Sequence, residues 1–298
     1  MQLAAELAKY GPDARGDAPS LDAAQRYCRS LAESHYENFT VASWFMPRAL
    51  RQHFCNLYAY CRWADDLADE TADPQQAEAL LDWWEAQTRA LPDGAQRHPV
   101  FIALSETAHQ FELPQQPLLD LLTAFRQDQR QSRYETFDEL HAYCRHSANP
   151  VGRLVLHLGR CHNQDTTKLS DSICTGLQLA NFCQDVARDY ERGRIYLPHE
   201  DCRRFRFTED RFAERTATAE FRNLLQFEVN RAEQFLVRGR PLAQLVAPEL
   251  RIPVRLFVAG GLAILAAIRR QRYDVWQRRP TVSRAAKLRL LARAWSGI

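Results

Sequence analysis

The chain has 298 residues, of which 46% are hydrophobic and 26% are charged. This composition excludes a disordered chain and allows a substantial core, arranged as one large domain or two modest ones. Because 39 basic and 37 acidic residues leave a formal net charge of +2, no global charge attracts nucleic acid, and we expect no nucleic-acid partner.

The N-terminal segment offers little for packing. Residues 1–20 include Gly, Pro and Asp, and we expect them to be loosely ordered. They do not show a basic region followed by an apolar one, which is the pattern of a secretory signal, so we expect a cytoplasmic location.

Helical patterns dominate the remaining chain. Good helix formers occur in nearly every segment, apolar residues recur at intervals of three and four, and sustained alternation of β-branched residues is lacking. Gly and Pro clusters divide the chain into about ten expected helices, without a flexible linker between two groups of them. The sequence therefore predicts a single all-α domain at residues 21–298.

A polar stripe crosses the first strongly apolar helix, near residues 57–69. Tyr58, Arg62, Asp65 and Asp69 follow one another at intervals of four, three and four, so they share one helix face. Burying such a stripe without partners would be costly, so it faces solvent or lines a cavity that holds charge.

A second stripe occurs on another apolar helix, near residues 177–189. Gln178, Asn181, Asp185 and Asp189 are spaced three, four and four apart. Either stripe alone could be a solvated face whose ion pairs contribute only a few tenths of a kcal/mol. Two of them on separate apolar helices favour a cavity.

If the two helices face each other, four carboxylates converge and repel one another unless divalent cations bridge them. Mg²⁺ suits such a site because it combines one or two carboxylates with water and substrate phosphates, which predicts metal-assisted departure of diphosphate. No Gly-rich phosphate loop is present. Two-metal hydrolysis is an alternative, and a di-iron centre is another, although neither helix has the Glu-x-x-His spacing of di-iron bundles.

Four other features need an interpretation. The eight cysteines form no Cys-x-x-Cys pair and are interpreted as buried reduced thiols. His157, Cys161 and His162 have a spacing that a structural zinc could use, but no second cluster accompanies them. Residues 253–268 predict a buried core helix that is too short for a membrane span, with interfacial membrane contact as the alternative. Nine Lys and Arg residues between positions 269 and 293 should make the C-terminal end electropositive.

With these motifs the chain resembles the squalene and phytoene synthase family over residues 31–287. The resemblance implies an all-α fold, the single-domain class I isoprenoid-synthase bundle with a central apolar substrate channel. It implies that Asp65, Asp69, Asn181, Asp185 and Asp189 bind Mg²⁺ and the diphosphate of a prenyl substrate. The residues implied to hold diphosphate or guide its ionisation are Tyr58, Arg62, Gln178, Asn181, Tyr196 and Arg279.

Two departures from the common family pattern indicate a subtype. The chain reads HYENF at residues 35–39 instead of His-Ser-x-Ser-Phe, and SANPVG at residues 147–152 instead of Val-Ala-Gly-x-Val-Gly. Both resemble the branch of hopanoid biosynthesis that makes hydroxysqualene. The resemblance implies Mg²⁺-dependent ionisation of presqualene diphosphate, carbocation rearrangement and a water quench, which releases hydroxysqualene and diphosphate.

The water quench requires one positioned solvent molecule in an otherwise dry channel. The polar residues near the two departures are candidates to hold this water or the substrate: His35, Tyr36, Asn38, Tyr143, His146 and Asn149. Asn149 could instead cap the helix that Pro150 begins, and Tyr143 could be an ordinary core residue with a satisfied hydroxyl.

Two alternatives to this activity stay open. One is a head-to-head synthase that condenses two farnesyl diphosphates to presqualene diphosphate or a C30 carotenoid precursor. The other is a non-catalytic family member that acts as an assembly factor, although all four aspartates are present. The favoured interpretation also implies peripheral contact with the inner face of the membrane, and functional coupling to a presqualene diphosphate synthase and a hydroxysqualene reductase.

Overall fold

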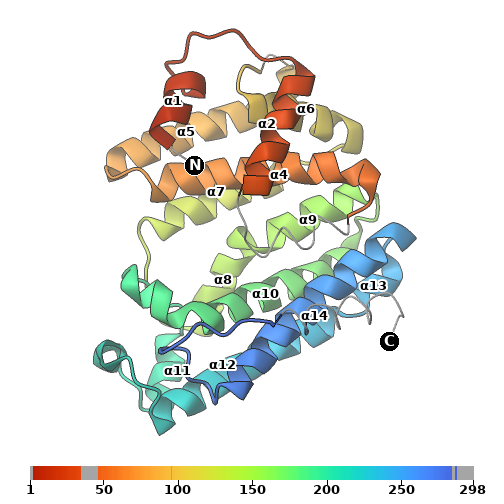
Figure 1. Cartoon of the computed structure of the whole chain (residues 1–298). Coiled ribbons are helices and arrows are strands. Elements are labelled where there is room, and N and C mark those ends of the chain that lie inside the picture. Colours follow the sequence, from red (N-terminus) through yellow and green to blue (C-terminus); the bar gives the residue numbers. More distant parts are fainter. Residues whose placement is uncertain (1–2, 35–45, 95, 284–285, 287–298) are drawn as a thin grey trace. The chain divides into compact units, whose positions relative to one another are not determined.

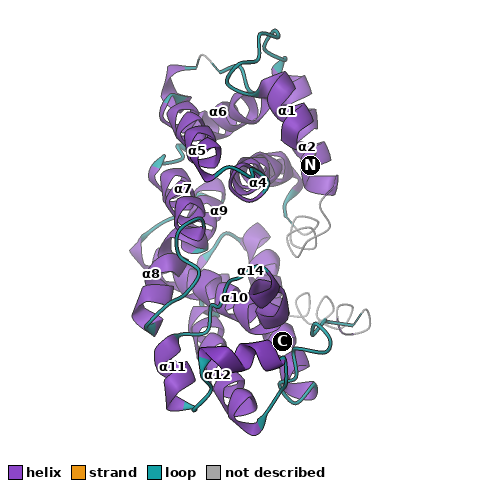
Figure 2. Ribbon diagram, turned by 90° about the vertical axis from the view of Figure 1, so that its left-hand side faces the viewer, coloured by secondary structure: helices purple, strands orange, loops and turns teal. Residues whose placement is uncertain are grey.

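The computed structural model describes residues 3–34, 46–94, 96–283 and 286. Within these ranges every regular element is a helix, so the all-α prediction is confirmed (Figure 2). The α-helices are α1 (Leu3–Tyr10), α2 (Leu21–Ser34), α4 (Arg48–Asp69), α5 (Pro74–Arg89), α6 (Pro99–Phe111), α7 (Gln116–Asp128), α8 (Phe137–Ser147), α9 (Asn149–Leu158), α10 (Gln164–Glu191), α11 (His199–Arg204), α12 (Ala219–Gly239), α13 (Leu242–Leu245) and α14 (Pro248–Arg270). Two 3₁₀ helices, η1 (Leu91–Asp93) and η2 (Glu209–Glu214), complete the elements.

The chain forms two compact units, each of which is discontinuous in the sequence. Unit 1 contains residues 1–130 and 153–162, and unit 2 contains residues 131–152 and 163–298. The border at residue 152 falls inside α9, so this helix contributes to both units. The expected single domain at residues 21–298 stays a prediction.

The core of unit 1 is built on aromatic side chains that hold α4 in place. The rings of Trp63 on α4 and Trp84 on α5 stack with centroids 5.3 Å apart. Tyr60, one turn before Trp63, is fully buried and donates its hydroxyl hydrogen to the Leu118 carbonyl oxygen at 3.0 Å. Because Tyr60 and Trp63 fix the buried side of α4, Arg62, which lies between them in the sequence, is held on another side.

Helix α1 corrects the expectation that residues 1–20 are loosely ordered. Residues Leu3–Tyr10 are helical, and the Tyr10 ring packs edge-on against Tyr27 of α2 at 5.4 Å. Tyr27 donates its hydroxyl hydrogen to Glu6 at 2.7 Å and accepts a hydrogen bond from Trp63 at 2.9 Å. The expectation was wrong for α1 because composition does not show that an aromatic contact and a buried polar chain can anchor a short helix.

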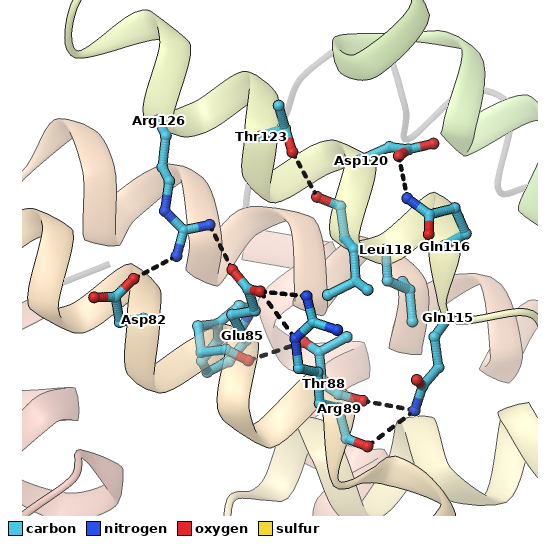
Figure 3. A network of polar contacts seen from close by, with 12 residues as sticks. Asp82, Glu85, Thr88, Arg89, Gln115, Gln116, Leu118, Asp120, Thr123 and Arg126 are labelled. Carbon is cyan, nitrogen blue, oxygen red and sulfur yellow. Dashed lines mark hydrogen bonds and ion pairs between the residues drawn. The ribbon is translucent and has the colours of Figure 1, made fainter.

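A polar network joins α5 and α7 in unit 1 (Figure 3). The Arg126 guanidinium donates to Glu78 at 3.0 Å, to Asp82 at 2.7 Å and to Glu85 at 2.7 Å. Arg126 is mostly buried, whereas the neighbouring Arg130 is exposed and pairs with Glu78 at 3.1 Å. Because several carboxylates share one ordered cation, this network should stabilise the unit more than an isolated surface pair does.

We expect Arg126→Met to lower the free energy of unfolding by about 1 kcal/mol, a value discounted for solvent screening. Arg130→Met, in the turn that follows α7, is the matched control and should change it by less than about 0.5 kcal/mol. Urea denaturation followed by circular dichroism measures both values. Equal effects of the two substitutions would show that the shared cation adds nothing beyond a surface charge.

Unit 2 is organised around α10, α12 and α14, which lie side by side (Figure 1). Glycines allow their close approach. A Cβ atom added at Gly176 would lie 2.8 Å from the Leu236 side chain, and one at Gly261 would lie at the same distance from Leu236. One at Gly239 would lie 2.9 Å from the Leu169 carbonyl oxygen. The three helices therefore pack more closely than larger residues at these positions would permit.

The structure also shows the cysteines, the apolar segment at residues 253–268 and the pair His157 and His162. All eight cysteines are free thiols, as predicted, and four of them are buried. Residues 253–268 lie in α14, whose buried side packs on α10 and α12. By length and composition α14 is the one helix within the described ranges that could cross a membrane. The rings of His157 and His162 stack with centroids 4.1 Å apart.

Candidate functional site

The first polar stripe lies on α4, in unit 1. Tyr58, Arg62 and Asp65 are partly exposed and Asp69 is exposed, while Trp63 anchors the buried side of the helix. The Arg62 guanidinium lies 3.3 Å from the Asp65 carboxylate. The predicted spacing thus gives one helical face that carries a cation and two accessible carboxylates.

The sequence interpretation missed one member of this cluster. Asp66 is only 1% exposed and forms an ion pair with Arg62, four residues earlier on the same helix. Burial raises the pKa of the Asp66 carboxyl, and the nearby Arg62 opposes that change. The spacing of four was the signal that could have identified Asp66. Its position indicates that it orients Arg62.

The second polar stripe lies on α10, in unit 2. Gln178, Asn181, Asp185 and Asp189 are all partly buried, and Asn181 donates to the Asp185 carboxylate at 2.8 Å. A capping box begins this long helix: the Asn163 side-chain oxygen accepts from the Thr166 backbone N–H, and the Asn163 backbone N–H donates to the Thr166 hydroxyl oxygen. A single rigid helix therefore carries all four residues of the stripe.

Arg279, which follows α14, reaches this stripe from the far end of the chain. Its Nε and Nη2 atoms both donate to Asp185, the latter at 2.8 Å, and Nη2 also donates to Gln184 at 3.1 Å. Gln184 in turn donates to the Pro280 carbonyl oxygen at 2.6 Å. The structure thus brings Arg279 and Asp185 together. Gln184, which the stripe pattern passed over because it lies on the next face of α10, holds the segment after Arg279.

Asp189 lies in a small cleft of unit 2. Burial, followed by the neighbouring charge of Asp185, raises the pKa of the Asp189 carboxyl to about 7. The cleft also contains Arg194, which was not identified from the sequence and which lowers that pKa. The residues that line the cleft are Phe182, Val186, Asp189, Arg194, Ile195, Tyr196, Leu197 and Phe212.

Tyr196 and Tyr143 belong to one aromatic cluster beside this cleft. Gly193 adopts a left-handed conformation (φ 74°) at the end of α10, and the chain then turns back. Tyr196 consequently stacks on Phe182 of α10 with centroids 4.0 Å apart. The Tyr196 ring also lies 6.0 Å from Tyr143 on α8 and 5.9 Å from Tyr134. Phe182 and Tyr196 also line the cleft, so this buried cluster supplies part of its aromatic wall.

The SANPVG segment, at the start of α9, is anchored on α10 within unit 2. Thr175 donates its hydroxyl hydrogen to the Asn149 side-chain oxygen at 3.0 Å, and Asn149 is buried. A Cβ atom at Gly152 would lie 2.4 Å from the Ser170 hydroxyl oxygen. Asn149 is the first residue of α9, and its side chain binds α10. The candidates His35, Tyr36 and Asn38 lie outside the described residues.

The donor set of the stripes fits a divalent cation. Asp185 and Asp189 are carboxylates one helical turn apart, and burial already disfavours the charge on Asp189, so a bound cation would relieve a real electrostatic cost. Each unit carries one stripe with two aspartates. Within the described ranges, no group of three His, Cys, Asp or Glu side chains that could hold a metal ion is found.

Comparisons with known proteins agree with these motifs. The squalene/phytoene synthase family model matches residues 16–286. Phytoene synthase from Arthrospira platensis is 31% identical, over 98% of this chain and 96% of that protein. Hydroxysqualene synthase from Rhodopseudomonas palustris is 40% identical over 168 residues, which are 55% of this chain and 56% of that protein.

A solved structure extends the agreement to the fold. The crystal structure of squalene synthase HpnC from Alicyclobacillus acidocaldarius matches with a TM-score of 0.82 and 46% identity, over 85% of this chain and 96% of that one. The all-α isoprenoid-synthase fold that the motifs predicted is thereby confirmed. The chain is an isoprenoid synthase of the kind that processes prenyl diphosphates. From its matched length and its level of identity, we conclude that it belongs to the squalene/phytoene synthase family.

Proposed function

We propose that the protein is a hydroxysqualene synthase, which converts presqualene diphosphate and water into hydroxysqualene and diphosphate. The main support is the 40% identity to a hydroxysqualene synthase over 168 residues, against 31% identity to a phytoene synthase over 304 residues. The HYENF and SANPVG departures point the same way. In this reaction the C–O bond to diphosphate breaks, the carbocation rearranges, and water adds with loss of a proton.

The proposed cation is Mg²⁺, with Asp65 and Asp69 as its ligands on α4 and Asn181, Asp185 and Asp189 as its ligands on α10. When bound, it would neutralise the diphosphate and thereby improve it as a leaving group. Arg62 and Arg279 are the side-chain cations that would bind the same oxygens, and each already contacts an aspartate of its own stripe. Tyr58 and Gln178 lie on the same helical faces and would contribute hydrogen bonds.

The aromatic cluster and the SANPVG segment have a proposed role after ionisation. The stacked rings of Tyr143, Phe182 and Tyr196 present faces that attract a positive charge, which would stabilise a carbocation during rearrangement. Asn149 has an amide nitrogen in addition to the oxygen that accepts from Thr175, so it can donate a hydrogen bond to the quenching water. His35, Tyr36, Asn38 and His146 stay candidates for the same task.

The two alternative functions differ from this proposal in the substrate that is consumed and in whether diphosphate is released. A head-to-head synthase would consume farnesyl diphosphate alone, and an assembly factor would release no diphosphate from either substrate.

We expect the protein to be cytoplasmic and coupled to a presqualene diphosphate synthase upstream and a hydroxysqualene reductase downstream. This places it between a step that supplies a C30 diphosphate and a step that reduces an allylic alcohol.

The deciding experiment incubates the purified protein with Mg²⁺ and, separately, with presqualene diphosphate and farnesyl diphosphate. We expect a C30 alcohol from presqualene diphosphate only, with one oxygen from ¹⁸O-labelled water detected by mass spectrometry. Conversion of farnesyl diphosphate to a C30 product would establish the head-to-head alternative. No turnover of either substrate, with folding intact, would favour the assembly factor.

A further inference from the structure

An exposed apolar line runs along the segment that joins α12 to α14 in unit 2. Within the described ranges only three large apolar side chains are exposed: Leu21 at 38%, Val237 at 43% and Leu245 at 53%. Two of them lie eight residues apart in this segment, with exposed Pro241 midway between them. Isolated exposed apolar residues are ordinary, but their alignment along one segment requires an explanation.

The backbone shows that these side chains share one side. Arg240 and Pro241 both keep right-handed helical angles (φ −49°, ψ −40° and φ −58°, ψ −20°), so the path from α12 into α13 stays helical. Backbone hydrogen bonds from Ala243 to Arg240 and from Gln244 to Pro241 continue it. Residues four apart therefore fall on the same face. The opposite face is buried through Leu236, Gly239, Leu242, Ala243 and Val246.

Positive charge flanks this line. Arg238, Arg240 and Arg251 are exposed, and Glu249 is the exposed acid among them. None of the three guanidinium groups forms an ion pair within the described part of the chain. Arg238 instead lies over the Phe235 ring at 5.3 Å. Figure 1 shows α13 beside α14, and Arg251 lies in the first turn of α14, six residues after Leu245 in the sequence. Apolar residues edged by unneutralised arginines are typical of surfaces that bind anionic lipid.

We propose that Val237, Pro241 and Leu245, with Arg238, Arg240 and Arg251, form a docking surface for an anionic lipid bilayer. Charge decides between occupants. A second copy of the chain docked on the same surface about a twofold axis would gather the arginines of both copies in one interface, which is repulsive, whereas lipid phosphates attract them. The surface lies on a segment distinct from the aspartate stripes. The inference goes beyond the proposed function and does not depend on it.

Vesicle co-sedimentation of the full-length protein tests this surface. We expect binding to vesicles of equal parts phosphatidylcholine and phosphatidylglycerol, weaker binding at high salt, and little binding to phosphatidylcholine alone. Arg238→Gln and Arg240→Gln should each lower the partition coefficient about fivefold. Leu245→Glu should lower it about tenfold, because it removes an inserted apolar group and adds a repelled charge.

Leu21→Glu is the matched control, because Leu21 is also exposed and apolar but lies on α2 in unit 1. It should leave vesicle binding unchanged. Binding that Leu245→Glu and Leu21→Glu reduce equally, or that neither reduces, would overturn the proposal. A second result would also overturn it: the wild-type protein does not bind anionic vesicles and is a dimer in analytical ultracentrifugation, whereas the Leu245→Glu protein is a monomer. A second copy of the chain would then be the occupant of this surface.

Discussion

Asp185→Asn is expected to lower the rate of diphosphate release from the prenyl substrate at least about a hundredfold while the protein stays folded. Asp185 is at the centre of the α10 stripe, where it accepts hydrogen bonds from Asn181 and Arg279. Asparagine has nearly the same shape, so the helix should be preserved. It lacks the negative charge that would hold a cation, and it pairs less well with a guanidinium group.

The measurement is steady-state release of diphosphate at saturating Mg²⁺, accompanied by circular dichroism. Asp165→Asn is the matched control: Asp165 is an exposed aspartate in the first turn of the same helix, outside the stripe. That substitution should change the rate by less than about twofold. If Asp185→Asn retained more than about a tenth of the wild-type rate, the assignment of the α10 aspartates would be wrong.

Arg231→Met is expected to lower the free energy of unfolding by about 3–5 kcal/mol. The Arg231 guanidinium donates to Asp201 at 2.7 Å and to both oxygens of Glu228, at 3.0 and 2.9 Å, and both carboxylates are buried. Its plane also lies over the Phe137 ring at 4.1 Å. Methionine keeps much of the packing but leaves buried carboxylates without a cation, which is the costly outcome.

Arg238→Met is the control for this loss, because Arg238 is on the same helix and also lies over a ring, but is exposed. It should cost less than about 0.5 kcal/mol. Adding Asp201→Asn to Arg231→Met should recover more than about half of the lost stability, because the uncompensated charge is gone. A single Arg231→Met protein with near-wild-type stability in urea denaturation would contradict the account of this cluster.

The same cluster has a defined dependence on pH. Burial raises the pKa of Glu228 from its ordinary value of 4.5 to about 8, and the charge of Asp201 raises it further while Arg231 opposes the change. A folded-state pKa above the unfolded value means that this contribution to stability is present at low pH and is lost as pH rises toward 8. Glu228→Gln should therefore flatten the fall in stability between about pH 4.5 and pH 8.

Sequence periodicity predicted the helices and both stripes because helical spacing alone decides which residues share a face. Arg279 could be assigned only by resemblance, since its contact with Asp185 joins positions 94 residues apart, which no local pattern reveals. Tyr134 and Arg194 were missed for the same reason. Asp66 differs from these residues, because its spacing of four from Arg62 is visible in the sequence. The predicted stripe followed only the exposed face of the helix and therefore did not include this buried partner.

The interleaving of the two units has a consequence for biosynthesis. Residues 153–162 complete unit 1, where Arg160 donates to the Gln110 carbonyl oxygen at 3.3 Å and lies over the Phe111 ring. They leave the ribosome only after residues 131–152, which belong to unit 2. Because translation proceeds from the N-terminus, unit 1 cannot complete its fold until residues 153–162 have emerged, and by then part of unit 2 has already been synthesised. A nascent chain stalled before Arg153 should therefore lack native protection around Phe111, and no single cut can release either unit intact.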